Sequence, residues 1–402
     1  HMPKQGCWCE YCKNKFKQET GLDAPAATDV NDPIWWKYRE FMNVTIERTF
    51  VRYRKEFHKK NPNLVILVAS NLWPSLNDPQ TMGRLYRVVD LHKTEFHCGL
   101  KQRGGLMKMP TEGRGIPHAV GQVVGFVVSR DATGGRPPHI WTPRLINETE
   151  ALYATSGMVG HGCIANLDQA DTKIPRMDFK SSHELGDKVS KYYAGTMPLR
   201  WLAIHFSEHA RDSYWDDHAK AWENVLYPIY GAYEAMMKNH LPVNFITDSQ
   251  LEDGLHDWYK LLFIPDRSKL TANMHNSLAA YTSKGGTVIH NQPRWQWGDV
   301  AGCDTAIKDL MKELAPYART APLHVTGGPE RMQSDSFFNH EKKRLTVSCI
   351  YVYSWVNGEN DRGNAPSPIK GVSIVLRSES GVPPKTVIEG VSGKELKFKH
   401  HD

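Results

Sequence analysis

The middle of this chain alternates short, branched apolar segments with helices, and this alternation limits the possible folds more than any other feature. Strands that alternate with helices form a parallel sheet whose faces the helices cover. Helices are predicted at 223–240 and 271–284, so the region predicts an open, doubly wound sheet. The four predicted strands are RWLAIHFSE (200–208), PVNFITDSQ (242–250), KLLFIPD (260–266) and GGTVIHN (285–291).

The region from Cys7 to about Lys191 also alternates predicted helices and strands. A helix is predicted at 33–60, where Asn61 and Pro62 stop it, and NLVILVASN (63–71) is typical of a buried parallel strand. It supplies three or four strand–helix units, too few to close an eight-stranded barrel. The later segments are VVDLHKTEF (88–96), VGQVVGFVVSR (120–130), PPHIWTPR (137–144), the helix ETEALYATSGMVGHG (148–162) and the strand GCIANLD (162–168).

The last region, 323–402, has a different pattern. Two strands, RLTVSCIYVYSW (344–355) and GVSIVLRS (371–378), lie between loops rich in Gly, Pro, Asn and Asp. This pattern is typical of an antiparallel β-sandwich. The chain therefore divides into regions 1–196, 197–322 and 323–402.

Three of the seven cysteines, Cys7, Cys9 and Cys12, lie within six positions, and the others are scattered. An odd, uneven set of this kind does not make a disulfide framework. The cluster is either a metal knuckle or a set of free thiols. A nucleic-acid zinc finger is not expected, because no second Cys/His pair follows at finger spacing.

The net charge is +6, from 50 basic and 44 acidic residues, which is mild for 402 residues. The densest basic run, RTFVRYRKEFHKK (48–60), is interpreted as the solvated face of a helix. No apolar run is long enough to span a membrane. The sequence therefore predicts neither a nucleic-acid partner nor a membrane partner.

Three segments together resemble the family 42 glycoside hydrolases, the β-galactosidases. GCWCEYCKNKF (6–16) is similar to the family's C-x-C-x-x-C followed by a helix with Phe, 200–291 resembles its trimerisation domain, and RLTVSCIYVYSW resembles the start of its terminal β domain. The resemblance implies an α/β chain: the C-terminal half of a (β/α)8 barrel, a flavodoxin-like domain and a small antiparallel β-sandwich. It also implies a homotrimer and a carbohydrate substrate.

The resemblance also explains where the knuckle lies. In the family the knuckle follows the fourth barrel strand, so the first four strands and the acid/base Glu are expected to be absent from this chain. The family implies a structural zinc on Cys7, Cys9 and Cys12, with a fourth Cys from an earlier loop. The second domain resembles glutamine amidotransferases, but KLLFIPD leads to no Cys or Gly elbow. We therefore expect no chemistry there and no organic cofactor.

Glycoside hydrolysis needs two carboxyl groups. The family's nucleophile ends strand seven, but the corresponding segment, PPHIWTPR, ends without a carboxylate. Glu148 and Glu150 belong to the next helix. The best candidate is Glu95 at the end of VVDLHKTEF, ahead of Asp168 after the last strand. Alternatively, Glu95 forms an ion pair with Lys93 or Arg103, or lies in water.

Sugar binding needs aromatic faces and polar groups at the strand ends. The candidate substrate-binding residues are Trp73, His92, His97, His139, Trp141 and Arg144. The resemblance predicts a β-galactosidase-like glycoside hydrolase that cleaves terminal galactose-type residues, with part of its active site outside this chain. The alternative is a non-catalytic carbohydrate-binding or assembly protein that has lost the nucleophile.

Overall fold

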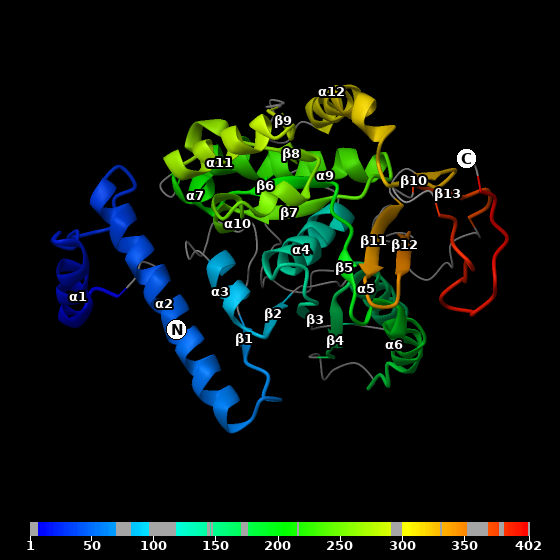
Figure 1. Ribbon diagram of the computed structural model, residues 1–402, viewed down its shortest axis with the longest axis horizontal. Coiled ribbons are helices and arrows are strands. Elements are labelled where there is room, and N and C mark those ends of the chain that lie inside the picture. The colour runs from blue at the N-terminus through cyan, green and yellow to red at the C-terminus, as the bar shows by residue number, and fades with distance from the viewer. Residues whose placement is uncertain are drawn as a thin grey trace.

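The computed structural model describes residues 7–69, 82–95, 118–142, 145, 148–169, 176–214, 217–290, 300–329, 332–351, 369–377 and 382–400. Two parallel sheets with helices packed against them form the centre of the molecule, and two small antiparallel sheets lie beside them (Figure 1). The expected α/β fold with parallel sheets is confirmed. Among the described residues, no helix is both long and apolar enough to cross a membrane.

The first parallel sheet, sheet A, has the strand order β1-β2-β3-β4. Helices connect the strands, as the sequence predicts. The apolar segment 120–130 forms one of these helices, and its described valines are buried almost completely, which explains its unbroken apolar sequence. The elements are β1 (Leu67–Ala69), α3 (Met82–Val88), β2 (Leu91–Glu95), α4 (His118–Ala132), β3 (His139–Thr142), α5 (Glu148–Gly160), β4 (Ile164–Leu167) and α6 (Lys180–Tyr193).

The second parallel sheet, sheet C, has the order β7-β6-β8-β9. The strand order reverses at β6, as expected for a doubly wound sheet. Both faces are buried: Leu202 and Ile204 join one apolar cluster, while Ala203 and Leu262 join the other. The elements are β6 (Leu202–Phe206), α7 (Glu208–Asp212), α8 (His218–Ala221), a π-helical turn (Trp222–Leu226), α9 (Tyr227–Lys238), β7 (Asn244–Thr247), α10 (Asp248–Glu252), β8 (Leu261–Phe263), α11 (Ala272–Ser283), β9 (Thr287–Ile289) and α12 (Val300–Ala318).

The C-terminal strands form two antiparallel sheets. β11 (Gln333–Asn339) lies between β12 (Arg344–Ile350) and β5 (Met197–Pro198), while β10 (Leu323–Thr326) pairs with β13 (Ser373–Leu376). The predicted strands are present in part, but the predicted β-sandwich is not confirmed. The pairing of β5 with β11 joins residues that lie far apart in the sequence.

At the N-terminus, α1 (Glu10–Thr20) packs against α2 (Pro33–Lys60), whose bounds match the prediction (Figure 1). The Asp32 carboxylate accepts a hydrogen bond from the Ile34 amide at 2.7 Å and so caps α2. An ion pair between Arg39 and Asp212 connects α2 to α7.

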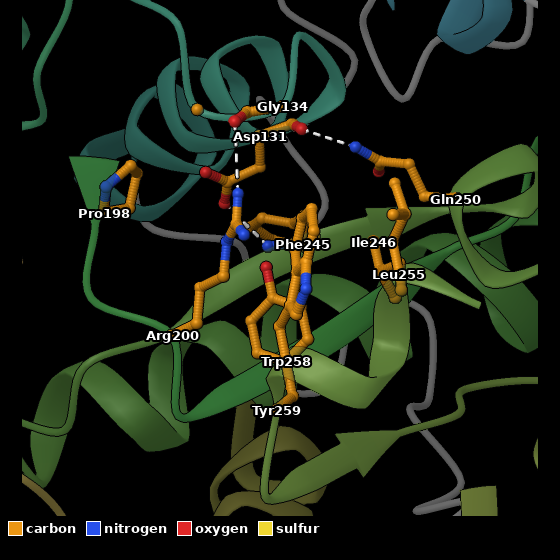
Figure 2. A pocket seen from close by; sticks show the side chains of 11 residues that line it. Asp131, Gly134, Pro198, Arg200, Phe245, Ile246, Gln250, Leu255, Trp258 and Tyr259 are labelled. Carbon is orange, nitrogen blue, oxygen red and sulfur yellow. Dashed lines mark hydrogen bonds between the residues drawn. The ribbon is translucent and has the colours of Figure 1, made fainter. Parts of the chain in front are cut away.

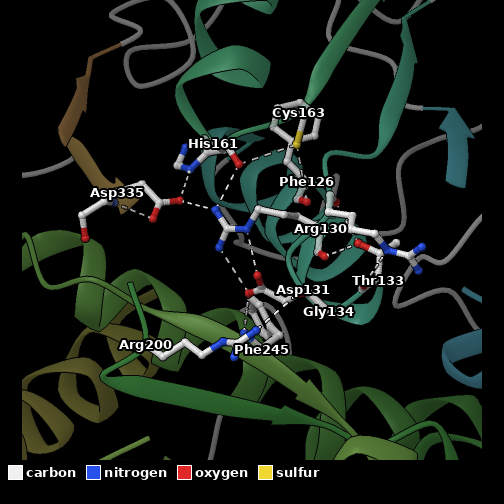
Figure 3. Close-up of polar contacts among 12 residues, drawn as sticks. Phe126, Arg130, Asp131, Thr133, Gly134, His161, Cys163, Arg200, Phe245 and Asp335 are labelled. Atoms are coloured by element: carbon white, nitrogen blue, oxygen red, sulfur yellow. Dashed lines mark hydrogen bonds and ion pairs between the residues drawn. The ribbon is translucent and has the colours of Figure 1, made fainter. Parts of the chain in front are cut away.

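A buried ionic network lies where the three regions of the chain meet (Figure 3). The Arg130 guanidinium, at the end of α4, forms ion pairs with Asp131 (Nε to Oδ1, 2.8 Å) and with Asp335 of β11 (Nη1 to Oδ2, 2.5 Å). Asp131 accepts a hydrogen bond from the Phe245 amide of β7, and His161 contacts Asp335 at 3.2 Å. The network connects the end of α4, which packs against sheet A, to β7 of sheet C and to β11 of a C-terminal sheet.

Candidate functional site

The two faces of sheet A have different surroundings, because side chains alternate along each strand. On one face, Val68 packs with Leu85 and Val89, and Ile140 joins the core that includes the α4 valines and Met158 of α5. The other face carries half-buried Lys93, His139, Trp141 and Asn166 and exposed Ile164. We call this second face the open face of sheet A.

The strand register aligns the backbone positions of the open face in two adjacent rows. Lys93 lies opposite His139, and Glu95 lies opposite Trp141, which in turn lies opposite Asn166. The Lys93 ammonium reaches from the first row to the second, where its Nζ atom lies 5.3 Å from the centre of the Trp141 ring. This distance is typical of a cation–π contact.

The predicted site residues fall into three groups. Glu95, the last residue of β2, lies opposite Trp141 in the backbone register, and its side chain is outside the described part of the structure. His92 is fully buried on the opposite face, where its ring stacks on Tyr86 with 3.7 Å between centroids. Residues three apart in a strand point to opposite faces, so His92 cannot flank Glu95 as we expected. Trp73, His97 and Arg144 lie outside the described residues.

Lys93 and Asn166 are further candidate residues of the open face, and no sequence motif marks them. The alternation of side chains along a strand could have indicated them. Lys93 precedes Glu95 by two positions and so shares its face, and Asn166 of β4 lies opposite Trp141. The Nδ1 atom of His139 is buried and has no hydrogen-bond partner among the described residues. This nitrogen is therefore a candidate for a hydrogen bond to a ligand.

Burial, reinforced by the nearby Lys93 charge, lowers the pKa of His139. A neutral imidazole offers one donor and one acceptor to a bound molecule. The backbone of Asp168, directly after β4, continues the sheet, because its amide donates to the Thr142 carbonyl at 3.0 Å. The open face can thus offer an aromatic surface, a cation, an amide and an imidazole.

The three N-terminal cysteines lie close together around the start of α1. Their Sγ atoms are all within 4.8 Å of one another, and those of Cys7 and Cys9 are 3.2 Å apart. A tetrahedral zinc ion with bonds of about 2.3 Å would hold its sulfur ligands about 3.8 Å apart, so this group fits three ligands of one metal ion. Burial, together with the neighbouring sulfurs, raises the pKa of Cys12 to about 12.

A small pocket lies between the end of α4, β5 and sheet C (Figure 2). The Arg200 guanidinium stacks 3.7 Å from the centre of the Trp258 ring and donates to the Gly134 carbonyl at 3.2 Å. The space is about 10 Å³, enough for about one water molecule. The pocket is therefore too small for a sugar ring.

Comparison with known proteins identifies the fold. No protein-family model matches the sequence, and no curated protein matches it. A GH42 β-galactosidase from G. stearothermophilus matches the structure with a TM-score of 0.53 and 13% identity, covering 70% of this chain and 49% of that one. The β-galactosidase of Bacillus circulans sp. alkalophilus gives 0.51 and 13% over the same shares.

A rhamnosidase from Novosphingobium sp. PP1Y matches with a TM-score of 0.52 and 10% identity, covering 85% of this chain and 37% of that one. The chain thus spans about half the length, or less, of these solved structures. The expected resemblance to GH42 β-galactosidases is confirmed at the level of the fold.

Proposed function

We propose that this chain is part of a glycoside hydrolase resembling β-galactosidases, which cleaves terminal galactose-type residues from oligo- or polysaccharides. The sugar lies on the open face of sheet A. The observation that carries the proposal is the register, which gathers Glu95, Trp141 and Asn166 in one row, beside Lys93 and His139, on a glycoside-hydrolase fold. Part of the active site comes from outside this chain.

Each group on the open face has a chemical role in this proposal. The Trp141 ring stacks on the C–H face of the sugar, while the Asn166 amide and the neutral His139 imidazole form hydrogen bonds to its hydroxyl groups. Glu95 supplies one of the two carboxyl groups of the reaction. Glu95 either protonates the glycosidic oxygen as the acid, or serves as the nucleophile or base on the opposite side of the sugar. The second carboxyl group comes from outside this chain.

The test of catalysis is the substitution Glu95→Gln, in the full natural chain, with nitrophenol release from aryl glycosides as the readout and the β-D-galactoside first. We expect kcat/KM to fall by ~10²-fold or more while the fold is retained. Glu148→Gln is the matched control, since Glu148 is exposed at the start of α5. Equal rates for wild type and Glu95→Gln would contradict the catalytic role of Glu95.

A second candidate function is a carbohydrate-binding or assembly protein without catalytic activity. The observation in its favour is that PPHIWTPR, which includes β3, carries no carboxylate where the family's nucleophile is expected. This candidate predicts that the natural chain binds galactosides in calorimetry but releases no nitrophenol from any member of the panel.

Two assembly features belong to the same proposal. Cys7, Cys9 and Cys12 hold one structural zinc ion, and the flavodoxin-like region forms a homotrimer. The large aromatic side chains Trp222, Tyr227 and Tyr230 of this region are part of the chain's own core, each 1% exposed. A trimer must therefore use other side chains of that region, and light scattering on the natural chain measures its mass.

A further inference from the structure

We propose that the three N-terminal thiols, Cys7, Cys9 and Cys12, form a reversible redox site. A small dissolved disulfide, such as glutathione disulfide, oxidises Cys9 and Cys12 there to one intramolecular disulfide. This reaction is a covalent chemistry that a structural zinc site alone does not imply. It involves the start of α1 and no residue of sheet A, so its test is independent of glycoside binding and cleavage.

The sulfur atoms of this cluster lie within reach of one another. All three Sγ atoms are within 4.8 Å, and those of Cys7 and Cys9 are 3.2 Å apart. Cys9 is the N-cap of α1 and Cys12 is its third helical residue, and residues three apart in a helix have Cβ atoms about 5–6 Å apart. A disulfide needs Cα atoms about 4.4–6.8 Å apart. A small adjustment of the first helical turn therefore allows the Cys9–Cys12 bond.

The two members of this pair differ in their access to solvent. The Cys9 thiol is exposed, whereas Cys12 is partly buried. A dissolved disulfide therefore meets Cys9 first, because exchange requires contact between the attacking and the attacked sulfur atoms. Cys12, whose sulfur atom lies within 4.8 Å of that of Cys9, is in position to complete the reaction.

The reaction consists of two exchange steps. The Cys9 thiolate attacks one sulfur atom of glutathione disulfide, forms a mixed disulfide and releases one glutathione. The Cys12 thiolate then attacks the Cys9 sulfur atom, forms the intramolecular disulfide and releases the second glutathione. The two cysteines lose two electrons, which reduce glutathione disulfide, and the two thiol protons leave with the two glutathione thiols. An excess of reduced glutathione reverses both steps.

The packing of α1 against α2 holds the cluster in place without using its sulfur atoms. Trp8, between Cys7 and Cys9, stacks on Tyr38 of α2 with 5.0 Å between ring centroids. The Tyr38 hydroxyl donates a hydrogen bond to the Cys7 carbonyl, and the fully buried Phe16 of α1 meets the same ring edge-on. These contacts do not depend on the redox state of the thiols, so the disulfide can form and open in the folded chain.

Oxidation and metal binding at this cluster exclude each other. Zinc binds thiolates, and only Cys7 keeps its thiol once Cys9 and Cys12 are joined. A chain that holds zinc through the cluster should therefore release the ion on oxidation and bind it again after reduction.

The experiment treats the reduced natural chain with glutathione disulfide, alkylates the remaining thiols and maps the peptides by mass spectrometry. Proteolytic cleavage after Glu10 separates Cys12 from Cys7 and Cys9, so a peptide pair that stays joined identifies a bond to Cys12. Cys7→Ser shows whether that bond needs Cys7. Cys349→Ser, in β12, is the matched control, and circular dichroism of each variant reports on folding.

We expect the two peptides to stay joined in wild type, Cys7→Ser and Cys349→Ser, and to separate after treatment with dithiothreitol. Cys12→Ser lacks the second attacking thiol and should instead carry glutathione on Cys9. In chains loaded with zinc, the zinc content should fall from about one ion per chain to near zero in parallel with oxidation.

Three results would overturn the proposal. The first is a cluster whose thiols all stay free in an excess of glutathione disulfide. The second is a Cys7–Cys9 disulfide in wild type, and the third is glutathione that remains on Cys9 in wild type as it does in Cys12→Ser. A failure to bind or cleave galactosides would overturn the proposed function and leave this redox chemistry untouched.

Discussion

The three N-terminal thiols repel one another when they ionise, because their sulfur atoms lie within 4.8 Å. A bound divalent cation removes this repulsion, since thiolates are the form that binds zinc. We expect about one zinc ion per chain by plasma mass spectrometry after purification in zinc-supplemented medium. Cys12→Ser should lower this content to near zero and lower the melting temperature, because metal binding contributes to folding.

The matched control for the zinc prediction is Cys349→Ser, since Cys349 lies in β12, outside the cluster. It should retain the zinc content of wild type. An equal, low zinc content in wild type and in Cys12→Ser would mean that the cluster is a set of free thiols.

Single residues also show how far the sequence could predict the site. Glu95, His139 and Trp141 were found because they follow or belong to recognisable strand segments, and the register places them on one face. The expected position of His92 beside Glu95 was wrong, because side chains alternate between the two faces of a strand. Lys93 carries no motif of its own. Its cation–π contact with Trp141 depends on the pairing of β2 with β3, which no local pattern records.

At the scale of elements, α2 offers the sharpest prediction. Asp32 caps its first turn through the Ile34 amide, with Pro33 at the first helical position. Asp32→Ala should lower the free energy of unfolding by ~1 kcal/mol in urea titration, because the amide loses its partner.

Asp23→Ala is the control, because Asp23 is exposed and forms only a surface ion pair with Lys17. Its effect should stay below ~0.5 kcal/mol. Equal effects of the two substitutions would contradict the capping role.

The elements also show where sequence reasoning stops. The strands β6, β7 and β8 of sheet C were visible because each is buried on both faces and therefore forms a short apolar segment in the sequence. The ends of α2 were visible because Pro33 and Asn61 mark them. The pairing of β5 with β11 had no such signal, since it joins Pro198 to Phe337 and depends on the tertiary fold. The predicted β-sandwich of residues 323–402 did not include β5.

At the scale of the whole molecule, the buried network around Arg130 predicts that the three regions unfold together. Arg130 is fully buried and is paired with two carboxylates, Asp131 beside it and Asp335 of β11 (Figure 3). Arg130→Met would leave both carboxylates buried without their cation, so we expect a loss of ~3–5 kcal/mol in the free energy of unfolding. Calorimetry should show one transition for wild type. Lys55→Met, which changes an exposed cation of α2, should cost less than ~0.5 kcal/mol.

The same network predicts how stability depends on pH. Burial opposes the ionisation of Asp335, but the Arg130 charge and His161 outweigh it and hold its pKa below the usual value of 3.8. A carboxyl group whose pKa is lower in the folded state stabilises the fold above its unfolded pKa. That contribution is lost as the pH falls through the folded pKa.

The free energy of unfolding of wild type should therefore exceed that of Asp335→Asn at pH 7, and this gap between the two free energies should narrow below about pH 4. Asp23→Asn, at an exposed position, should show almost no gap at any pH. A gap for Asp335→Asn that stays constant from pH 7 to pH 3 in urea titrations would mean that the Asp335 charge does not stabilise the junction.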